Sequence, residues 1–388
     1  MTPTAALVYG SGLEAYDFGP LHPFKAERFS LAVDLLSDYG VLGKDIAVLE
    51  PVAADTRQLE RVHTKNYLGL LRVGSADPQA WIIPQAGLGT ADDPLFRGAY
   101  EASALVCGAT TQALRAVLDG EYTRAMSIAG GLHHAYADHA KGFCFMNDLA
   151  VAIADALARD PGLRVAYVDI DAHHGDGVQD IFYGEPRVLT VSVHESGTFL
   201  FPGTGFPDET GVGPGLGASA DLPLPPRATD ECFRLAMGEF VEPVVTAFRP
   251  DVIVAQLGVD AHHADPLTTL GLTLPAYAGL VDSLVGLADR VCDGRLATTG
   301  GGGYGVYSVV PRAWAWATAR LGDVTLPEEL PEAWKERIER LGVTPPPERL
   351  LEDDYEPDPL EASMLLKLTE RAARTALDEF AADACLNV

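Results

Sequence analysis

The chain has 388 residues, of which 47% are hydrophobic and 21% charged, a composition typical of a folded globular protein and not of a fibrous or disordered one. Its 28 Lys and Arg residues are outweighed by 55 Asp and Glu residues, so the net charge is −27 at pH 7 with neutral histidine. Such a surface repels phosphate backbones and attracts cationic partners, which argues against a nucleic-acid-binding protein.

Cysteine usage and hydropathy indicate a reduced, water-soluble protein. The cysteines are scattered and form no C-x-x-C pair, so we expect neither a disulfide framework nor a thiolate zinc cluster. They are Cys107, Cys144, Cys232, Cys292 and Cys385. The first residues lack the basic start and apolar run of a signal peptide, and no stretch approaches the roughly 18 consecutive apolar residues of a membrane helix. The sequence therefore predicts a cytoplasmic protein without a membrane partner.

Short apolar runs alternate with longer helical patterns along most of the chain. Runs rich in Val, Ile and Ala are typical of strands covered on both faces. They predict strands at 5–9, 124–129, 164–170, 187–194, 251–258 and 296–299. Apolar periodicity between capping and breaking residues predicts helices at 97–119, 147–159, 230–247 and 276–292. This alternation predicts a single α/β domain with a central, mostly parallel sheet flanked by helices.

Two segments interrupt this pattern. Residues 196–228 are rich in Gly and Pro and predict a long irregular loop, which in a compact domain is more often functional than incidental. Residues 343–360 are Pro-rich and acidic, and a helix is expected at 361–382. We expect residues 1–342 to form the main domain and residues 343–388 to pack on it as an appendage.

Six of the ten histidines occur as adjacent pairs after predicted strands: His133-His134, His173-His174 and His262-His263. In an open parallel sheet the carboxyl ends of the strands converge on the ligand site. Strand ends would therefore bring together GGLHH (130–134), DIDAHHGD (169–176), QLGVD (256–260) and TGGGGY (299–304). A lone histidine is more often structural, but three pairs at strand ends favour an active site there.

The segment from Asp169 to His173 has the pattern of a metal site. In an extended chain, residues two apart point to the same side, so Asp169, Asp171 and His173 share a face. A buried group of carboxylates and an imidazole is unfavourable unless a cation lies among them. Asp171 and His173, together with Asp260, predict a site for a divalent metal. Such a site would keep an open coordination position, as catalysis requires. The alternative is a solvated turn after a strand. An Asp₂His site admits either Zn²⁺ or Fe²⁺.

The remaining polar groups supply acid–base chemistry. A bound metal acidifies water and polarises a carbonyl, and neutral imidazole acts as base and acid near pH 7. His133 and His134 are the candidates, oriented by Asp169 and Asp176; alternatively, the pair only packs at a strand end. Tyr304 follows four glycines and can stabilise an oxyanion. The glycines lack the residues of a phosphate-binding loop, although a plain turn remains an alternative.

These motifs resemble those of the arginase-fold, zinc-dependent deacetylases of the histone deacetylase superfamily, particularly its bacterial acetoin-utilization branch. The matching segments are HPFKAER (22–28), GGLHHAYADHAKGFCFMND (130–148), YVDIDAHHGDGVQDIFY (167–183), VSVHESGTFLFPGTG (191–205), QLGVDAHHADPL (256–267) and GGGGY (300–304). The resemblance implies an arginase-like deacetylase domain over residues 1–342, with its active site at the carboxyl ends of the strands.

The resemblance also implies a role for each matched residue. The zinc ligands are Asp171, His173 and Asp260. The catalytic groups are His133, His134, Asp169, Asp176 and Tyr304. The acyl-lysine channel and its rim are formed by Asp92, Gly142, Phe143, Phe201, Leu267 and Gly302. A structural K⁺ or Na⁺ is expected at Asp169, Asp171, His173, Ser192 and Val193. Arg28 is expected in an internal channel that releases acetate.

One departure bears on the number of metals. Arginase-like relatives hold two manganese ions with D-x-H-x-D and D-x-D motifs, whereas this chain has Gly175 and His262 at two of those acidic positions. We therefore expect one metal and no ureohydrolase activity.

The predicted reaction is hydrolysis of N-acetyl-lysine in proteins, with basic acetyl-lysine segments as partners. An acetylated acyl-CoA synthetase is the substrate that the resemblance suggests. Two alternatives stay open. One is an acetylpolyamine amidohydrolase, because an acidic surface also attracts polyamines; the other is an acyl-lysine-binding protein without turnover. The sequence leaves the oligomeric state open.

Overall fold

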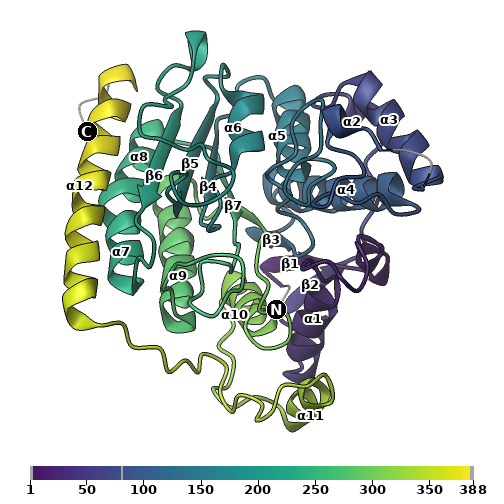
Figure 1. The fold of residues 1–388 in the computed structure, drawn as a ribbon, viewed down its shortest axis with the longest axis vertical. Coiled ribbons are helices and arrows are strands. Elements are labelled where there is room, and N and C mark those ends of the chain that lie inside the picture. Colours follow the sequence, from purple (N-terminus) through teal and green to yellow (C-terminus); the bar gives the residue numbers. More distant parts are fainter. Residues whose placement is uncertain (1–2, 80–81, 385–388) are drawn as a thin grey trace.

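The centre of the fold is a sheet of eight parallel strands (Figure 1). The computed structural model describes residues 3–79 and 82–384. The strands lie in the order β2-β1-β3-β8-β7-β4-β5-β6, and all their pairings are parallel. Their bounds are Ala5–Val8 (β1), Ile46–Leu49 (β2), Arg124–Ser127 (β3), Val165–Asp169 (β4), Val188–Glu195 (β5), Ser219–Leu224 (β6), Val252–Gln256 (β7) and Leu296–Thr299 (β8). The predicted α/β class and parallel sheet are confirmed.

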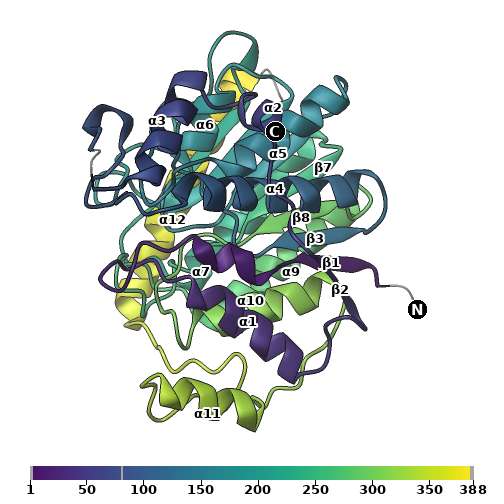
Figure 2. The same ribbon diagram turned by 90° about the vertical axis from the view of Figure 1, so that its right-hand side faces the viewer.

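Helices cover both faces of this sheet (Figure 2). Helices α4 and α5 pack together on one face, while α1, α9 and α10 lie on the other. The bounds are Glu27–Asp38 (α1), Thr56–Leu59 (α2), Lys65–Ala76 (α3), Ala99–Leu118 (α4), Asp148–Arg159 (α5), Asp176–Phe182 (α6), Asp230–Leu235 (α7), Glu242–Phe248 (α8), Leu274–Val291 (α9), Val310–Leu321 (α10), Glu332–Arg340 (α11) and Pro359–Ala384 (α12). A π-helical turn over Ala236–Val241 joins α7 to α8, so the helix predicted at 230–247 is one continuous run.

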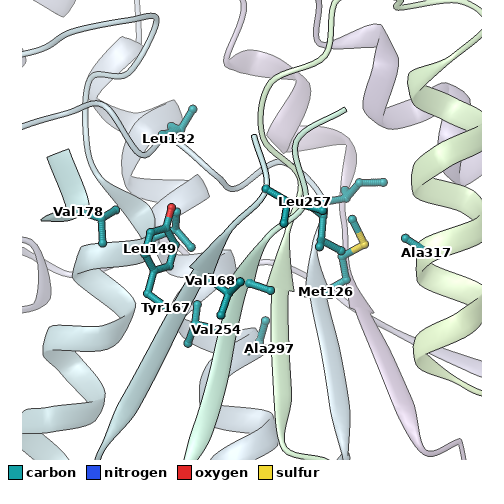
Figure 3. Packing of buried hydrophobic residues seen from close by; sticks show 14 of the residues in the cluster. Met126, Leu132, Leu149, Tyr167, Val168, Val178, Val254, Leu257, Ala297 and Ala317 are labelled. Carbon is teal, nitrogen blue, oxygen red and sulfur yellow. The ribbon is translucent and has the colours of Figure 1, made fainter. Parts of the chain in front are cut away.

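The central strands are buried along their whole length. Every residue of β3, β4, β7 and β8 is buried, and Met126, Val168, Val254 and Ala297 are among the side chains packed in the core around them (Figure 3). Leu149 of α5 packs in the same cluster. Burial on both faces is the reason that these strands read as continuous apolar runs and not as alternating patterns.

Two edge strands were not predicted. Residues 219–224 form β6, so the prediction of an irregular loop over all of 196–228 is wrong there. Pro223 and the flanking glycines masked the strand, but β6 lies at the edge of the sheet, where proline is tolerated because one side of the strand needs no partner. The other edge strand, β2, is partly exposed and too short to give a strong apolar pattern.

The C-terminal part of the chain packs along the β6 side of the sheet. Residues 341–358 contain no helix or strand, and α12 then runs beside β6 and α7. Its inner face buries Leu365, Thr369, Ala373, Ala376 and Phe380. The division into a main domain and an appendage stays a prediction. Cys385 lies outside the described residues, and the other four cysteines are buried and unpaired. Within residues 3–79 and 82–384, no helix combines the length and apolarity of a membrane span.

Candidate active site

Loops from four neighbouring strands converge at the carboxyl edge of the sheet. β3, β4, β7 and β8 are adjacent, and each is followed by one of the polar motifs. These loops border a cavity of about 260 Å³. The residues that line it are Phe24, Arg28, Asp92, Gly131, Leu132, His133, His134, Gly142, Phe143, Cys144, Asp171, His173, Leu200, Phe201, Leu267, Gly301, Gly302 and Tyr304. The predicted channel residues, the histidine pair and Tyr304 therefore meet in one place.

Two carboxylates and an imidazole form a compact cluster at the base of this cavity. Nδ1 of His173 lies 2.9 Å from Oδ2 of Asp260 and 3.1 Å from Oδ1 of Asp171. Both carboxylates are buried, and the three potential ligand atoms lie within 4.8 Å of one another. Burial and the charge of Asp171 raise the pKa of Asp260, because both disfavour its charged form.

The surroundings of the cluster hold the carboxylates in place and leave one side available to a metal. Oδ2 of Asp171 accepts hydrogen bonds from the Gln256 amide (2.6 Å) and from the backbone N–H of Gly302 (2.7 Å). Oδ1 of Asp260 accepts from the backbone N–H of Ala172 at 2.8 Å. One oxygen of each carboxylate is thus anchored, while Asp171 Oδ1 and Asp260 Oδ2 face the imidazole. This donor set fits a divalent metal with open positions toward the cavity.

The adjacent histidines are oriented by separate carboxylates. Nδ1 of His133 lies 2.7 Å from Oδ2 of Asp169, and Nδ1 of His134 lies 2.6 Å from Oδ1 of Asp176. Burial opposes the charged form of His133, but Asp169 and Asp171 outweigh it and raise its pKa to about 9. Burial and the neighbouring His133 lower the pKa of His134 to about 3. The surroundings therefore shift the pKa values of the two rings in opposite directions.

Two groups that the sequence did not single out also bind Asp176. Lys141 donates from Nζ to Oδ2 of Asp176, and the hydroxyl of Tyr136 donates to the same oxygen at 3.1 Å. Although burial opposes ionisation, the His134 and Lys141 contacts hold the pKa of Asp176 well below its usual range. Lys141 directly precedes Gly142 in the chain, but no local pattern indicated that its ammonium turns back toward Asp176.

Tyr304 is held at the cavity wall by its backbone and its ring contacts. Its N–H donates to Oδ2 of Asp265 at 2.7 Å, and its ring packs edge-on against Phe143. Burial and the nearby carboxylates raise the pKa of its phenol well above the ordinary value, so the hydroxyl stays protonated and can donate. Arg28 Cζ lies 5.8 Å from the centroid of the Tyr304 ring; its Nη1 donates to the carbonyl of Gly303 at 2.8 Å, and its buried Nε has no hydrogen-bond partner among the described residues. The predicted acetate channel around Arg28 stays a prediction.

Glycine is required at two positions of the channel wall. A Cβ at Gly142 would approach Cδ2 of His134 to 2.5 Å, and one at Gly302 would overlap Oδ2 of Asp260. Gly142 also has a φ of +57°, and the following Phe143 has a φ of +69°, which is rare for a residue with a side chain. This turn brings Phe143 into the cavity wall, which also contains Phe201, whose ring contacts His134 at a centroid distance of 5.1 Å.

The structure separates the neighbouring acids at the rim. Asp92 is exposed and lines the cavity, whereas Asp93 is buried. Burial and the charge of Asp92 raise the pKa of Asp93 to about 8. The predicted monovalent-ion residues lie on adjacent strands, with Asp169 in register with Ser192 and Val193 next along β5. The assignment of an ion to them stays a prediction.

Three of the six paired histidine rings, those of His133, His134 and His173, line the cavity, and the other three do not. His174 turns away from the cavity and bonds to Thr204 (2.8 Å) and Gln179 (3.0 Å). His262 and His263 bond to Asp353 instead of facing the cluster. His133 and His134 line the cavity together, whereas His173 lines it and His174 does not, so the direction of each ring depends on the loop that carries it.

The comparisons with known proteins agree with this geometry. Residues 22–321 match the histone deacetylase domain family. The chain is 40% identical over 312 residues to the acetoin utilization protein AcuC of Bacillus subtilis, covering 80% of each chain. It is 36% identical over 319 residues to AcuC of Staphylococcus xylosus, covering 81% of this chain and 82% of the relative.

Solved structures match the whole fold. An HDAC homolog from Aquifex aeolicus superimposes with a TM-score of 0.82 at 28% sequence identity, covering 95% of this chain and 100% of that chain. An HDAC homolog complexed with SAHA matches with the same values.

Proposed function

The chain belongs to the histone deacetylase family, and from this premise we propose that it is a metal-dependent deacetylase that hydrolyses N-acetyl-lysine in proteins. The observation that carries the proposal is the cavity in which the carboxylate–imidazole cluster, the histidine pair and Tyr304 meet. A metal site, a base and an oxyanion donor are the groups that amide hydrolysis requires. Their joint presence disfavours an acyl-lysine-binding protein without turnover.

Asp171, His173 and Asp260 would hold the metal, for which we propose Zn²⁺, with Fe²⁺ as the alternative that the same ligands accept. When bound, this ion would polarise the amide carbonyl and acidify a water molecule. A K⁺ or Na⁺ near Asp169, Ser192 and Val193 is proposed as a structural ion. Gly175 and His262 stand where a second divalent metal would need acids, which supports a one-metal enzyme.

The neutral ring of His134 is the proposed general base. Its Nε2 removes a proton from the attacking water while Asp176 holds its Nδ1. The water oxygen bonds to the acetyl carbon, and the hydroxyl of Tyr304 donates to the resulting oxyanion. His134 then returns the proton to the lysine nitrogen as the C–N bond breaks, giving acetate and lysine. The charged ring of His133 stays in place and stabilises the negative intermediate.

The proposed substrate is an extended acetyl-lysine side chain on a basic protein segment. Phe143 and Phe201 border the cavity and would contact the methylene chain, while the exposed Asp92 at the rim would accept from the backbone N–H groups of the substrate. The net charge of −27 favours a basic segment. Because the relatives are acetoin utilization proteins, we propose an acetylated acyl-CoA synthetase in the cytoplasm as the physiological substrate.

The test is steady-state turnover of an acetyl-lysine peptide by metal-stripped protein, before and after one equivalent of Zn²⁺ is added. Acetylspermidine is assayed in parallel, since a polyamine also suits an acidic rim. Restored turnover of the peptide supports the proposal. Turnover of acetylspermidine alone would replace the protein substrate with a polyamine, and no turnover of either would overturn the proposed reaction.

A further inference from the structure

An active-site loop is held by a residue that lies beyond the family match. Residues 257–273 connect β7 to α9 and contain no helix or strand. This loop carries Asp260 of the metal cluster, Asp265, which accepts from the backbone of Tyr304, and Leu267 of the channel wall. The position of three functional groups therefore depends on the contacts that anchor the loop.

Asp353, in the acidic segment after α11, is one of three carboxylates that anchor this loop from outside; Glu195 binds Thr269 and Asp230 binds Thr273. His262 donates from Nε2 to Oδ2 of Asp353, and His263 donates from Nε2 to Oδ1, each at 2.8 Å. The backbone N–H of Leu274, the first residue of α9, donates to Oδ2 at 3.0 Å, and that of Tyr355 donates to Oδ1 at 3.3 Å. The carboxylate is only 4% exposed, so these bonds are shielded from water.

His262, His263 and Asp353 are residue types that also occur in metal sites. Their hydrogen bonds to one another instead fix the loop to the segment that carries Asp353. The N–H of Ala264 donates to Nδ1 of His262 at 3.1 Å, so Nδ1 carries no proton and the neutral ring is protonated at Nε2. A metal ligand would need a free lone pair at that same Nε2. The observed arrangement satisfies the Asp353 carboxylate with four N–H donors and uses both ring nitrogens of His262.

The segment that carries Asp353 is fixed to the domain on both sides of it. Nη1 of Arg312, on α10, donates to the carbonyls of Arg349 at 3.1 Å and of Glu352 at 2.9 Å. Beyond Asp353, the ring of Tyr355 stacks on that of His263 with a centroid distance of 4.4 Å and an interplanar angle of 9°. Asp353 is thus presented at a defined position and not on a free tail.

We propose that Asp353 is a positioning residue of the deacetylase site, which acts through His262 and His263 to hold the loop that carries Asp260, Asp265 and Leu267. The proposal rests on the proposed function for its kinetic consequences. The family match ends at residue 321, so the site is completed by a segment outside the matched domain.

Asp353→Asn tests this role, with Asp354→Asn as the matched control. Asp354 is exposed and loses the same charge in the same segment. We expect Asp353→Asn to weaken Zn²⁺ binding 10- to 100-fold and to lower kcat at least tenfold, with KM changed less than threefold, as for other changes behind metal ligands. Asp354→Asn should match the wild type. A lower melting temperature with unchanged zinc affinity and kcat at 25 °C would show a purely structural role and overturn the proposal.

Zinc affinity, measured by competition with a fluorescent chelator, needs no substrate. If the wild-type protein turns over neither substrate, the proposed function fails, and zinc affinity alone decides the role of Asp353. If Asp353→Asn does not fold, His263→Ala and His263→Gln replace it. The alanine variant should lose zinc affinity, and glutamine, whose amide N–H still donates, should restore part of it. Equal affinity in wild type and His263→Ala would contradict the proposal.

Discussion

His133 and His134 face each other through their Nε2 atoms, which lie 3.1 Å apart, while each Nδ1 bonds to a different aspartate. Two positive charges at this distance repel strongly, so protonating one ring disfavours protonating the other. Asp169 and Asp171 favour the charged form of His133, whereas burial and His133 disfavour the charged form of His134. The two rings titrate as a coupled pair, and any group that changes the charge at Asp169 or Asp176 alters both.

Lys141 should therefore influence the pH dependence of catalysis. In Lys141→Met, the Asp176 carboxylate no longer shares its charge with an ammonium and attracts the His134 proton more strongly. The pKa of His134 rises, and because the base must be neutral, the acidic limb of kcat/KM moves to higher pH, by on the order of one unit. A pH–rate profile measures this shift. Lys141→Arg keeps the charge and should retain the wild-type limb; an unshifted limb in the methionine variant would contradict this prediction.

Tyr304→Phe should lower kcat about 10²- to 10³-fold with little change in KM, because the hydroxyl donates to an oxyanion that exists only after attack. The ring contact with Phe143 is kept, so the fold should be unaffected. Tyr307→Phe is the control, since Tyr307 lies close in sequence but does not line the cavity. Equal losses in the two variants would count against an oxyanion role for Tyr304.

Gly302→Ala should weaken metal binding. The new Cβ would overlap Oδ2 of Asp260, and the adjacent N–H could no longer hold Asp171 at its present distance. We expect zinc affinity to fall about 10- to 100-fold, measured by chelator competition. The control is Gly279→Ala in α9, where a Cβ meets no atom within 4 Å and affinity should be unchanged. Wild-type affinity in Gly302→Ala would mean that the Asp260 carboxylate can move without cost.

His63 should make the protein sensitive to mild acid. The ring is buried, Nδ1 donates to the carbonyl of Tyr136, and Nε2 accepts from the N–H of Asn147. Burial lowers its pKa from 6.5 to about 4. Between these values the unfolded chain binds more protons than the folded one, so stability is present above pH 6.5 and is lost as the pH falls toward 4. The loss is about 3 kcal/mol at most.

Chemical denaturation between pH 4 and 7 measures this loss. His63→Gln, which can still donate and accept, should flatten the pH dependence of the unfolding free energy over that range. His139→Asn, at a partly exposed position, should leave it unchanged. If the unfolding free energy of His63→Gln depends on pH as steeply as that of the wild type, other groups cause the acid sensitivity.

Much of the site follows from local sequence because its parts lie at strand ends. Asp169 ends β4 and Asp171 follows it in the loop, and parallel pairing brings the ends of β3, β4, β7 and β8 to the same edge. The buried strands could be predicted from their long apolar runs, because a strand that is buried on both faces has no alternation of polar and apolar residues. The edge strand β6 escaped prediction because Ser219, Asp221 and Pro223 interrupt its apolar run, although five of its six residues are buried.

Choices between distant partners needed the folded chain. Nothing local distinguishes Asp92 from Asp93, yet the first faces the cavity and the second is buried. Lys141 reaches Asp176, and Asp353 reaches His262 and His263 across about ninety residues of sequence. Periodicity and motif spacing predict on which side of its own helix or strand a side chain lies. These contacts depend instead on how separate elements pack against one another. The chemistry of the site was therefore readable from residue order, but its supporting contacts were set only by tertiary packing.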